Sequence, residues 1–295
     1  RKLKVNLCNV EHIMGDGGIH GAQNKIYCDE ALYFDVAGYY NLVMMKYNLL
    51  PTSIPEKGKE LYEFMYHEQI KLKKTNPRKR KLYKTILLSV YGAMENEYCD
   101  FYDPYKRGLV TATGQLFLCD LLEKIEPYVN LIQSNTDGVI AKLLDKKYEN
   151  KVLEIVNEWQ ERTGFVLKLE KVYDIYQRDV NNYMYRDESG KIHVLGEAVK
   201  YYNGWENSLE KNSYMSKEPI IIHYGIVDYL LNNISPEETV QKYRDSLRMF
   251  QYICKKGTFD WVEVEETYNN ETKTIKMQNV NRVFASNSSI KRVIY

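Results

Sequence analysis

Apolar residues at the start of the chain form short runs that are followed by a longer mixed stretch. The runs KIYC at 25–28 and ALYFDV at 31–36 predict two strands joined by a short turn. The stretch YYNLVMMKYNLL at 39–50 predicts a helix that Pro51 ends. Asp35 therefore stands at the end of a strand, a few residues before a helix begins.

The next stretch has a helical pattern that is interrupted once. Residues 60–74 and 78–93 predict two helices, and between them Asn76 is a typical cap and Pro77 a typical first-turn residue. From Lys71 to Lys84, eight of fourteen residues are Lys or Arg and none is acidic. A solvated face or a localisation signal is the usual interpretation of such a run. Because this run continues directly into an apolar helix, we expect its cations at the rim of a cleft.

The remainder of the chain alternates between hairpins and helices. In order, we predict a helix at 111–125, a hairpin formed by 129–133 and 138–144, a helix at 147–164, a strand at 165–173, a hairpin at 181–198 that turns at 188–190, and a helix at 236–257 among strand-like pieces. Antiparallel strands that alternate with helices in this way are typical of an α+β fold.

The composition narrows the class of protein only slightly. The 295 residues are 44% apolar and 27% charged with a net charge of +1, which allows a sizeable core and excludes no charged partner. No apolar run approaches the ~18 residues of a membrane span. Five scattered cysteines without C-x-x-C spacing are expected to be buried thiols in a reducing compartment. Because the chain starts at Arg1, we expect it to be a fragment of a longer protein.

Three polar positions stand out against these elements. Asp35 follows a strand, Asp137 lies in the turn SNTDG, and Lys84 shares a helix face with Tyr91 two turns further on. Each alone has an ordinary interpretation: a helix cap, a hairpin turn and a surface lysine. Together, two carboxylates on neighbouring strands would hold a pair of Mg²⁺ ions roughly 3.5–4 Å apart. A basic helix opposite them would neutralise a triphosphate.

The ordered set resembles the polymerase region of a family-B DNA polymerase, with phage enzymes the most similar type. FDVAGYYNLVMMKYNLLP resembles the family's first motif, D-F-x-S-L-Y-P-S with a following N-L-x-P element. KTILLSVYG resembles K-x-x-x-N-S-x-Y-G, and SNTDG resembles the D-T-D hairpin. LKLEKVY, NNYMY and GKIHVLGEA resemble the later strand pair, and GGIHGA a glycine-rich element near the template. The resemblance covers about residues 15–200.

The resemblance implies roles in the metal site for five residues. Asp35 and Asp137 would be catalytic and bind two Mg²⁺ ions, for which Mn²⁺ would substitute. Val36 would lend its backbone carbonyl. Asn135 and Thr136 would lie next to the metals.

It also implies contacts to nucleotide and DNA. Tyr40 would be the steric gate that excludes a 2′-hydroxyl, the group that distinguishes ribose from deoxyribose. Lys84, with Arg80, would contact the triphosphate. Tyr91 and Gly92 would form the floor under the nascent base pair, Tyr91 on the nucleotide side and Gly92 towards the DNA. The last assignment is Tyr183, which would touch primer or template.

Five positions depart from the family's pattern. Asn135 replaces the first Asp of D-T-D and removes a charge from the metal site, so weaker metal affinity with surviving activity is expected. The other departures are Leu88 for Asn, Asn181 for Lys, Gly38 for Ser and Asn41 for Pro. No counterpart of the family's proofreading exonuclease is expected within these residues.

The resemblance implies an α+β, right-hand polymerase with an antiparallel-sheet palm, short helical fingers and a mixed thumb. We expect palm at 1–51 and 98–200, fingers at 52–97 and thumb at 201–295. The expected reaction is template-directed transfer of nucleotides from dNTPs to a primer 3′-hydroxyl in DNA replication. Primer–template DNA, dNTPs and other replication proteins are the expected partners. The expected place is the cytoplasm, that of the host if the protein is viral, and no membrane is expected to be involved.

Three other interpretations remain open. A catalytically weakened relative would bind DNA without metal-dependent turnover, with Asn135 as the sign of decay. Another palm enzyme, a reverse transcriptase or RNA polymerase, is disfavoured by Tyr40 and by the helix of Lys84. A metal-dependent nuclease would use the same two carboxylates, but it leaves that helix unexplained.

Overall fold

The computed structural model describes residues 2–36, 38–196, 218–268 and 271–283. The chain forms two compact units. The first runs to Val180 and includes Arg186–Lys191, and the second comprises Asn181–Tyr185 and the chain from Ile192 onward. Each unit is described by itself.

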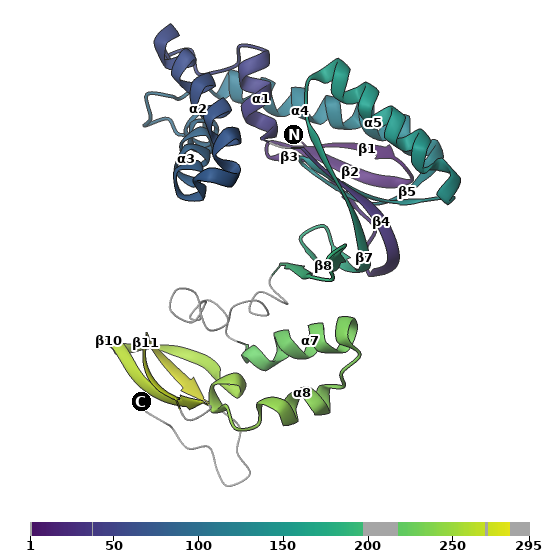
Figure 1. Cartoon of the computed structure of the whole chain (residues 1–295). Helices are drawn as coiled ribbons and strands as arrows, with labels where there is room; N and C mark the ends of the chain where they lie inside the picture. The colour runs from purple at the N-terminus through teal and green to yellow at the C-terminus, as the bar shows by residue number, and fades with distance from the viewer. Residues whose placement is uncertain (1, 37, 197–217, 269–270, 284–295) are drawn as a thin grey trace. The chain divides into compact units, whose positions relative to one another are not determined.

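The first unit is built on an antiparallel sheet (Figure 1). Across the sheet the strands lie in the order β1 (Leu3–Leu7), β2 (Val10–Gly15), β3 (Gly18–Ala22), β5 (Val129–Asn135), β6 (Gly138–Leu143), β4 (Ile26–Val36) and β7 (Leu167–Asp179). Each neighbouring pair is antiparallel. The predicted hairpin around Asp137 is confirmed as β5 and β6.

Strand β4 differs from its prediction, because it is one strand of 11 residues rather than two joined by a turn. Its pairing with β7 continues on both sides of Asp29, with Cys28 opposite Ile175 and Glu30 opposite Tyr173. The polar pair at 29–30 indicated a turn, but the long partner strand keeps this segment extended.

Helices α4 (Pro104–Ile125) and α5 (Glu149–Thr163) cover one face of the sheet (Figure 1). Phe34 and Val36 of β4 are buried in the core with these helices. Because side chains alternate along a strand, Tyr33 and Asp35 point to the opposite, open face. Helix α4 starts seven residues before its predicted first residue, since Asp103 caps it by accepting from the Lys106 N–H at 3.1 Å.

Three more helices extend the first unit, namely α1 (Tyr39–Lys46), α2 (Glu56–Thr75) and α3 (Pro77–Ala93). The break between α2 and α3 is as predicted, with the Asn76 side chain accepting from the Lys79 N–H at 3.0 Å. Helix α1 ends earlier than expected, before Asn48 with its φ of 52°. Tyr62 joins the three helices, because its hydroxyl donates to Asn41 at 2.9 Å and to the Leu87 carbonyl at 3.2 Å.

The remaining short elements are the 3₁₀ turns η1 (Glu126–Tyr128), η2 (Lys146–Tyr148) and η4 (Leu247–Phe250) and the hairpin strands β8 (Asn182–Asp187) and β9 (Ile192–Leu195). The hairpin turns at Glu188–Gly190, as predicted, and Gly190 has a φ of 80°.

In the second unit, α7 (Ile220–Asn232) and α8 (Pro236–Tyr243) precede a two-stranded sheet of β10 (Tyr252–Tyr268) and β11 (Glu271–Val283). The predicted helix at 236–257 is wrong beyond Tyr243, where the chain enters η4 and then β10. Helix α7 was not predicted. Its sequence is apolar almost throughout, and such a run does not distinguish a helix from a strand by its period.

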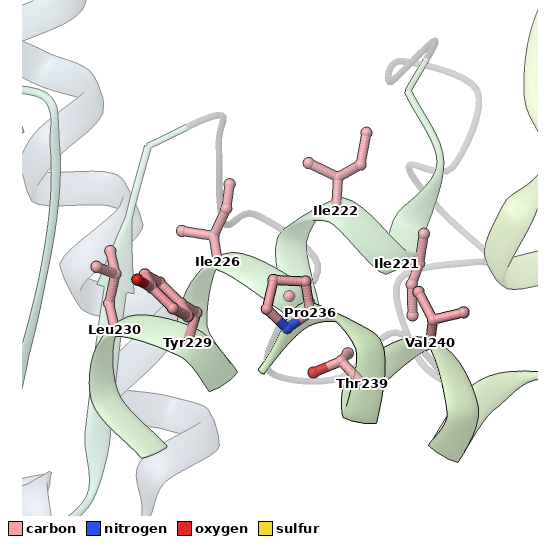
Figure 2. A pocket seen from close by; sticks show the side chains of 9 residues that line it. Ile221, Ile222, Ile226, Tyr229, Leu230, Pro236, Thr239 and Val240 are labelled. Atoms are coloured by element: carbon pink, nitrogen blue, oxygen red, sulfur yellow. The ribbon is translucent and has the colours of Figure 1, made fainter. Parts of the chain in front are cut away.

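An apolar groove of about 440 Å³ lies between α7 and α8 (Figure 2). Ile222, Ile226, Pro236 and Val240 line much of it.

Among the described helices, none has the length and apolar content needed to cross a bilayer.

Candidate functional site

The site is built around the tight turn between β5 and β6. The Asp137 N–H donates to the Asn135 carbonyl at 2.5 Å, which closes a three-residue γ-turn with Thr136 at its centre. Thr136 has a φ of 47°, an unusual conformation for a β-branched residue. Its N–H donates to the Ile19 carbonyl of β3 at 2.9 Å. Backbone strain of this kind occurs often at functional sites.

The end of β4 is bonded to the same turn. The Val36 N–H donates to the Asp137 carbonyl at 2.8 Å, and Asp35 lies opposite Gly138 in the ladder. The two predicted catalytic carboxylates are therefore brought together.

Electrostatics agree with this proximity. The pKa of Asp137 is raised to about 6, first by burial and then by the negative charge of Asp35. The pKa of Asp35 is also raised, mainly by burial, with Glu170 adding to the rise and Lys168 opposing it. Both carboxylates are thus costly to ionise unless a cation compensates them.

Lys84 supplies part of that compensation from α3, because its positive charge lowers the pKa of both Asp35 and Asp137. Its side chain is exposed, so the ammonium is available to an anionic ligand. Arg80 lies one turn earlier on α3 and is half-buried. No interaction of Arg80 with the two carboxylates is among those described.

A row of residues crosses the open face of the sheet at the level of the carboxylates. His20, Asn135, Gly138, Asp35 and Lys168 are successive cross-strand partners from β3 to β7. Gly138 carries no side chain, so the position between Asn135 and Asp35 is clear of side-chain atoms. Those two residues are two strand spacings apart, about 10 Å.

The donors around this position suit a hard divalent cation. They are the carboxylates of Asp35 and Asp137, the amide oxygen of Asn135 and the backbone carbonyl of Val36, and Mg²⁺ prefers oxygen ligands of these kinds. Within the part of the chain that the structure describes, no group of three or more His, Cys, Asp or Glu side chains is arranged to hold a metal. The residues fit Mg²⁺ through two carboxylates and neutral oxygens.

Tyr40 and Tyr91 form a stacked pair next to the carboxylates. Their ring centroids are 4.4 Å apart with 22° between the planes. The pKa of the Tyr40 hydroxyl is raised, first by burial, then by Tyr91 and by Asp137, so Tyr40 lies within the electrostatic reach of that carboxylate. Its hydroxyl donates to the Gly17 carbonyl at 2.8 Å. Gly92, the next residue after Tyr91, is exposed.

Helix α4 contributes three residues that the sequence analysis missed. Arg107 lies over the Tyr91 ring at 5.4 Å, Thr111 shares a 2.7 Å hydrogen bond with the Tyr91 hydroxyl, and Gln115 bonds to the turn between β2 and β3. The three are spaced four residues apart, so they share one face of the helix. That spacing was the signal that would have identified them.

Two of the sequence departures have local structural reasons. Gly38, where the family has Ser, has a φ of 66°, and a Cβ there would lie 3.3 Å from the Tyr66 ring. Asn41, where the family has Pro, accepts the Tyr62 hydroxyl. Leu88 is 48% exposed and packs into no core.

Tyr183 belongs to the second unit and is described with it. Its side chain is buried and stacks on Tyr185, with centroids 6.2 Å apart. Its predicted contact with DNA stays a prediction, as does the division of the chain into palm, fingers and thumb.

No protein-family model matches this chain, and no curated protein matches its sequence. Among solved structures, the chain is similar to the family B DNA polymerase from the hyperthermophilic archaeon Pyrobaculum calidifontis, with a TM-score of 0.49 and 14% identity. The match covers 89% of this chain and 40% of that polymerase. The chain thus spans well under half of that protein's length.

Proposed function

We propose that this chain is the polymerase region of a family-B DNA polymerase of phage type, which transfers nucleotides from dNTPs to a primer 3′-hydroxyl in DNA replication. The observation that carries the proposal is the convergence of Asp35, Asp137, Lys84 and Tyr40. Two half-buried carboxylates stand at the end of β4 and in the adjoining β5–β6 turn, a lysine lowers the pKa of both, and a stacked tyrosine lies within electrostatic reach of one of them.

The metal site would consist of Asp35, Asp137 and the Val36 carbonyl, with Asn135 as a neutral oxygen donor and Thr136 as the centre of the turn. Two bound Mg²⁺ or Mn²⁺ ions would supply charge stabilisation for the attacking and leaving oxygens. The protein's own part is to keep these donors in place, which the bonds from Val36 to Asp137 and from Thr136 to Ile19 do.

The nucleotide would be bound by side chains on α1 and α3. Lys84 would neutralise the triphosphate, with Arg80 one turn earlier on the helix. The stacked ring of Tyr40 would stand against the sugar and exclude a 2′-hydroxyl. Tyr91 and Gly92 would present a flat, open floor to the nascent base pair. Binding of primer–template DNA would rely on backbone contacts and weaken steeply with salt.

A weakened, DNA-binding relative is the second candidate, and Asn135 favours it. With a neutral amide at this position the site has two carboxylates rather than three, so its affinity for a divalent cation is reduced. This weakened relative would bind DNA through the same surface as the proposed polymerase, but it would not add nucleotides to the primer.

Primer extension on a short template, with Mg²⁺ or Mn²⁺, tests the proposal. Extension should vanish in Asp137→Asn and persist in Asp100→Asn, which removes an exposed carboxylate. Tyr40→Ala should gain ribonucleotide use. A chain that binds primer–template but extends it in neither metal would contradict polymerase activity. Recovery of extension in Asn135→Asp would then identify the weakened relative.

A further inference from the structure

The turn between β2 and β3, Gly15–Gly18, is held through all four of its backbone carbonyls. The Gln115 amide nitrogen donates to the carbonyls of Gly15 at 2.7 Å and Gly18 at 2.8 Å. The Thr111 hydroxyl donates to Asp16 at 3.4 Å. The Tyr40 hydroxyl donates to Gly17 at 2.8 Å.

The turn therefore links helix α4 to the ring of Tyr40. Gln115 and Thr111 both belong to α4, and Tyr40 belongs to α1. The ring of Tyr40 is also stacked on Tyr91, whose hydroxyl is bonded to Thr111. Stacking allows the two rings to slide over each other, whereas the bond to Gly17 fixes the end of the Tyr40 side chain.

The same turn also packs against the turn that carries Asp137. Gly18 has a φ of 139°, and a Cβ there would lie 2.6 Å from the Thr136 hydroxyl oxygen. This conformation is one that glycine adopts readily and other residues rarely. A displacement of the Gly15–Gly18 turn would thus reach the Tyr40 hydroxyl on one side and Thr136 on the other.

We propose that Gln115 is a positioning residue for sugar discrimination: by holding Gly15 and Gly18 it fixes Gly17, and Gly17 fixes the ring of Tyr40 against the sugar. The inference rests on the proposed polymerase function and goes beyond it, since Gln115 touches neither Tyr40 nor a carboxylate through any described bond. Gln115 is half-buried at one end of the link, so its loss frees the turn without opening the main core.

The test compares single-nucleotide incorporation of matched deoxyribo- and ribonucleotides. Gln115→Met keeps the length of the side chain and removes both hydrogen bonds. It should raise the relative kcat/KM for ribonucleotides about 5- to 30-fold, the range that corresponds to losing one or two hydrogen bonds. The kcat/KM for the deoxyribonucleotide should fall less than about 3-fold, which corresponds to a change of ~0.6 kcal/mol in activation free energy.

Three variants make the result specific. Gln69→Met changes a half-buried glutamine of α2 and should leave the ratio unchanged. Gln115→Lys keeps a donor and should restore much of the discrimination. In a Tyr40→Phe background, which lacks the bond to Gly17, Gln115→Met should have little further effect, because the two changes act through one link.

The outcomes separate this inference from the proposed function. If the intact chain extends primers and Gln115→Met keeps the parental ratio, the function stands and the role of Gln115 is overturned. Equal losses of both kcat/KM values, without a change in their ratio, overturn it as well, because they indicate a purely structural role. If the intact chain incorporates nothing in either metal, the polymerase function falls, and the role of Gln115 falls with it.

Discussion

The Val36 N–H donates to the Asp137 carbonyl at 2.8 Å, and this bond joins the end of β4, which carries the half-buried Asp35, to the β5–β6 turn, which carries the half-buried Asp137. The side chains of Asp35 and Asp137 consequently repel each other at a fixed separation. Burial raises the pKa of both carboxylates; the charge of Asp35 adds to the rise for Asp137, and that of Glu170 adds to the rise for Asp35. A bound cation would offset the cost of keeping two negative charges side by side, and four predictions address the parts of this site.

The first prediction concerns Asp137 in the absence of metal. Its folded-state pKa of about 6 exceeds the ordinary value of 3.8, so the folded protein resists ionisation that the unfolded chain undergoes freely. Below pH ~3.8 Asp137 is protonated in both the folded and the unfolded chain, so it does not lower the free energy of unfolding. As the pH rises from 3.8 to about 6, the unfolded chain ionises Asp137 before the folded protein does, and the free energy of unfolding falls.

Asp137→Asn removes this penalty. In EDTA at pH 7 the variant should be more stable to urea by on the order of 1–3 kcal/mol, and the difference should shrink towards zero near pH 4. Asp100→Asn, which removes a carboxylate at an exposed position, is the matched control. A variant that is less stable than the parent at pH 7 in EDTA would contradict the unfavourable burial of this carboxylate.

The second prediction concerns the strained turn. Thr136 is a β-branched residue with a φ of 47°, and glycine reaches this region without steric cost. Thr136→Gly should therefore unfold at a higher urea concentration than Thr136→Ala, by about 1 kcal/mol in free energy, although both lose the same hydroxyl. Equal stability of the two variants would mean that the backbone of this turn relaxes in solution.

The third prediction restores the residue that the family's pattern has at position 38. Gly38→Ser places a Cβ on a residue with a φ of 66° and within 3.3 Å of the Tyr66 ring. We expect a loss of about 1–2 kcal/mol in the free energy of unfolding. Gly92→Ser is the control, since a Cβ at Gly92 meets no atom within 4 Å. Thermal unfolding of both variants measures the difference.

The fourth prediction concerns metal affinity. Asn135→Asp adds a carboxylate two strand spacings from Asp35, so Mg²⁺ should bind more tightly, by at least about tenfold for one added hard ligand. Without metal the same variant should lose stability, because a third negative charge joins the pair. Asn130→Asp, on the same strand but exposed, should change neither property. Calorimetric titration with Mg²⁺ tests the predicted gain in affinity, and urea unfolding in EDTA tests the predicted loss of stability.

The antiparallel hairpin around Asp137 and the break between α2 and α3 were predictable from sequence. In both cases the signal lies within a few residues: Asp-Gly between apolar runs in one, and Asn76 followed by Pro77 in the other. The motif order likewise indicated that Asp35, Asp137 and Lys84 belong to one site. Asp35, Asp137 and Lys84 do lie within electrostatic reach of one another.

Errors arose where distant partners override a local preference. Asp29 and Glu30 indicated a turn, yet β7 holds them in one continuous strand. The stretch at 236–257 has a helical pattern, yet its second part becomes β10 because β11 pairs with it. Local propensity is a weak guide at such positions, because the pairing energy comes from residues far away in the sequence.

The sequence by itself determined the hairpin around Asp137, the break between α2 and α3, and which side chains carry charge, since caps and turn residues act within a few positions. The tertiary structure decided that β3 pairs with β5, so that Gly17 receives the Tyr40 hydroxyl and Gly18 meets Thr136. It also decided that Gln115 and Thr111 reach the same turn. These contacts join segments that are far apart along the chain, and only the packing of α4 and the sheet brings them within hydrogen-bonding distance.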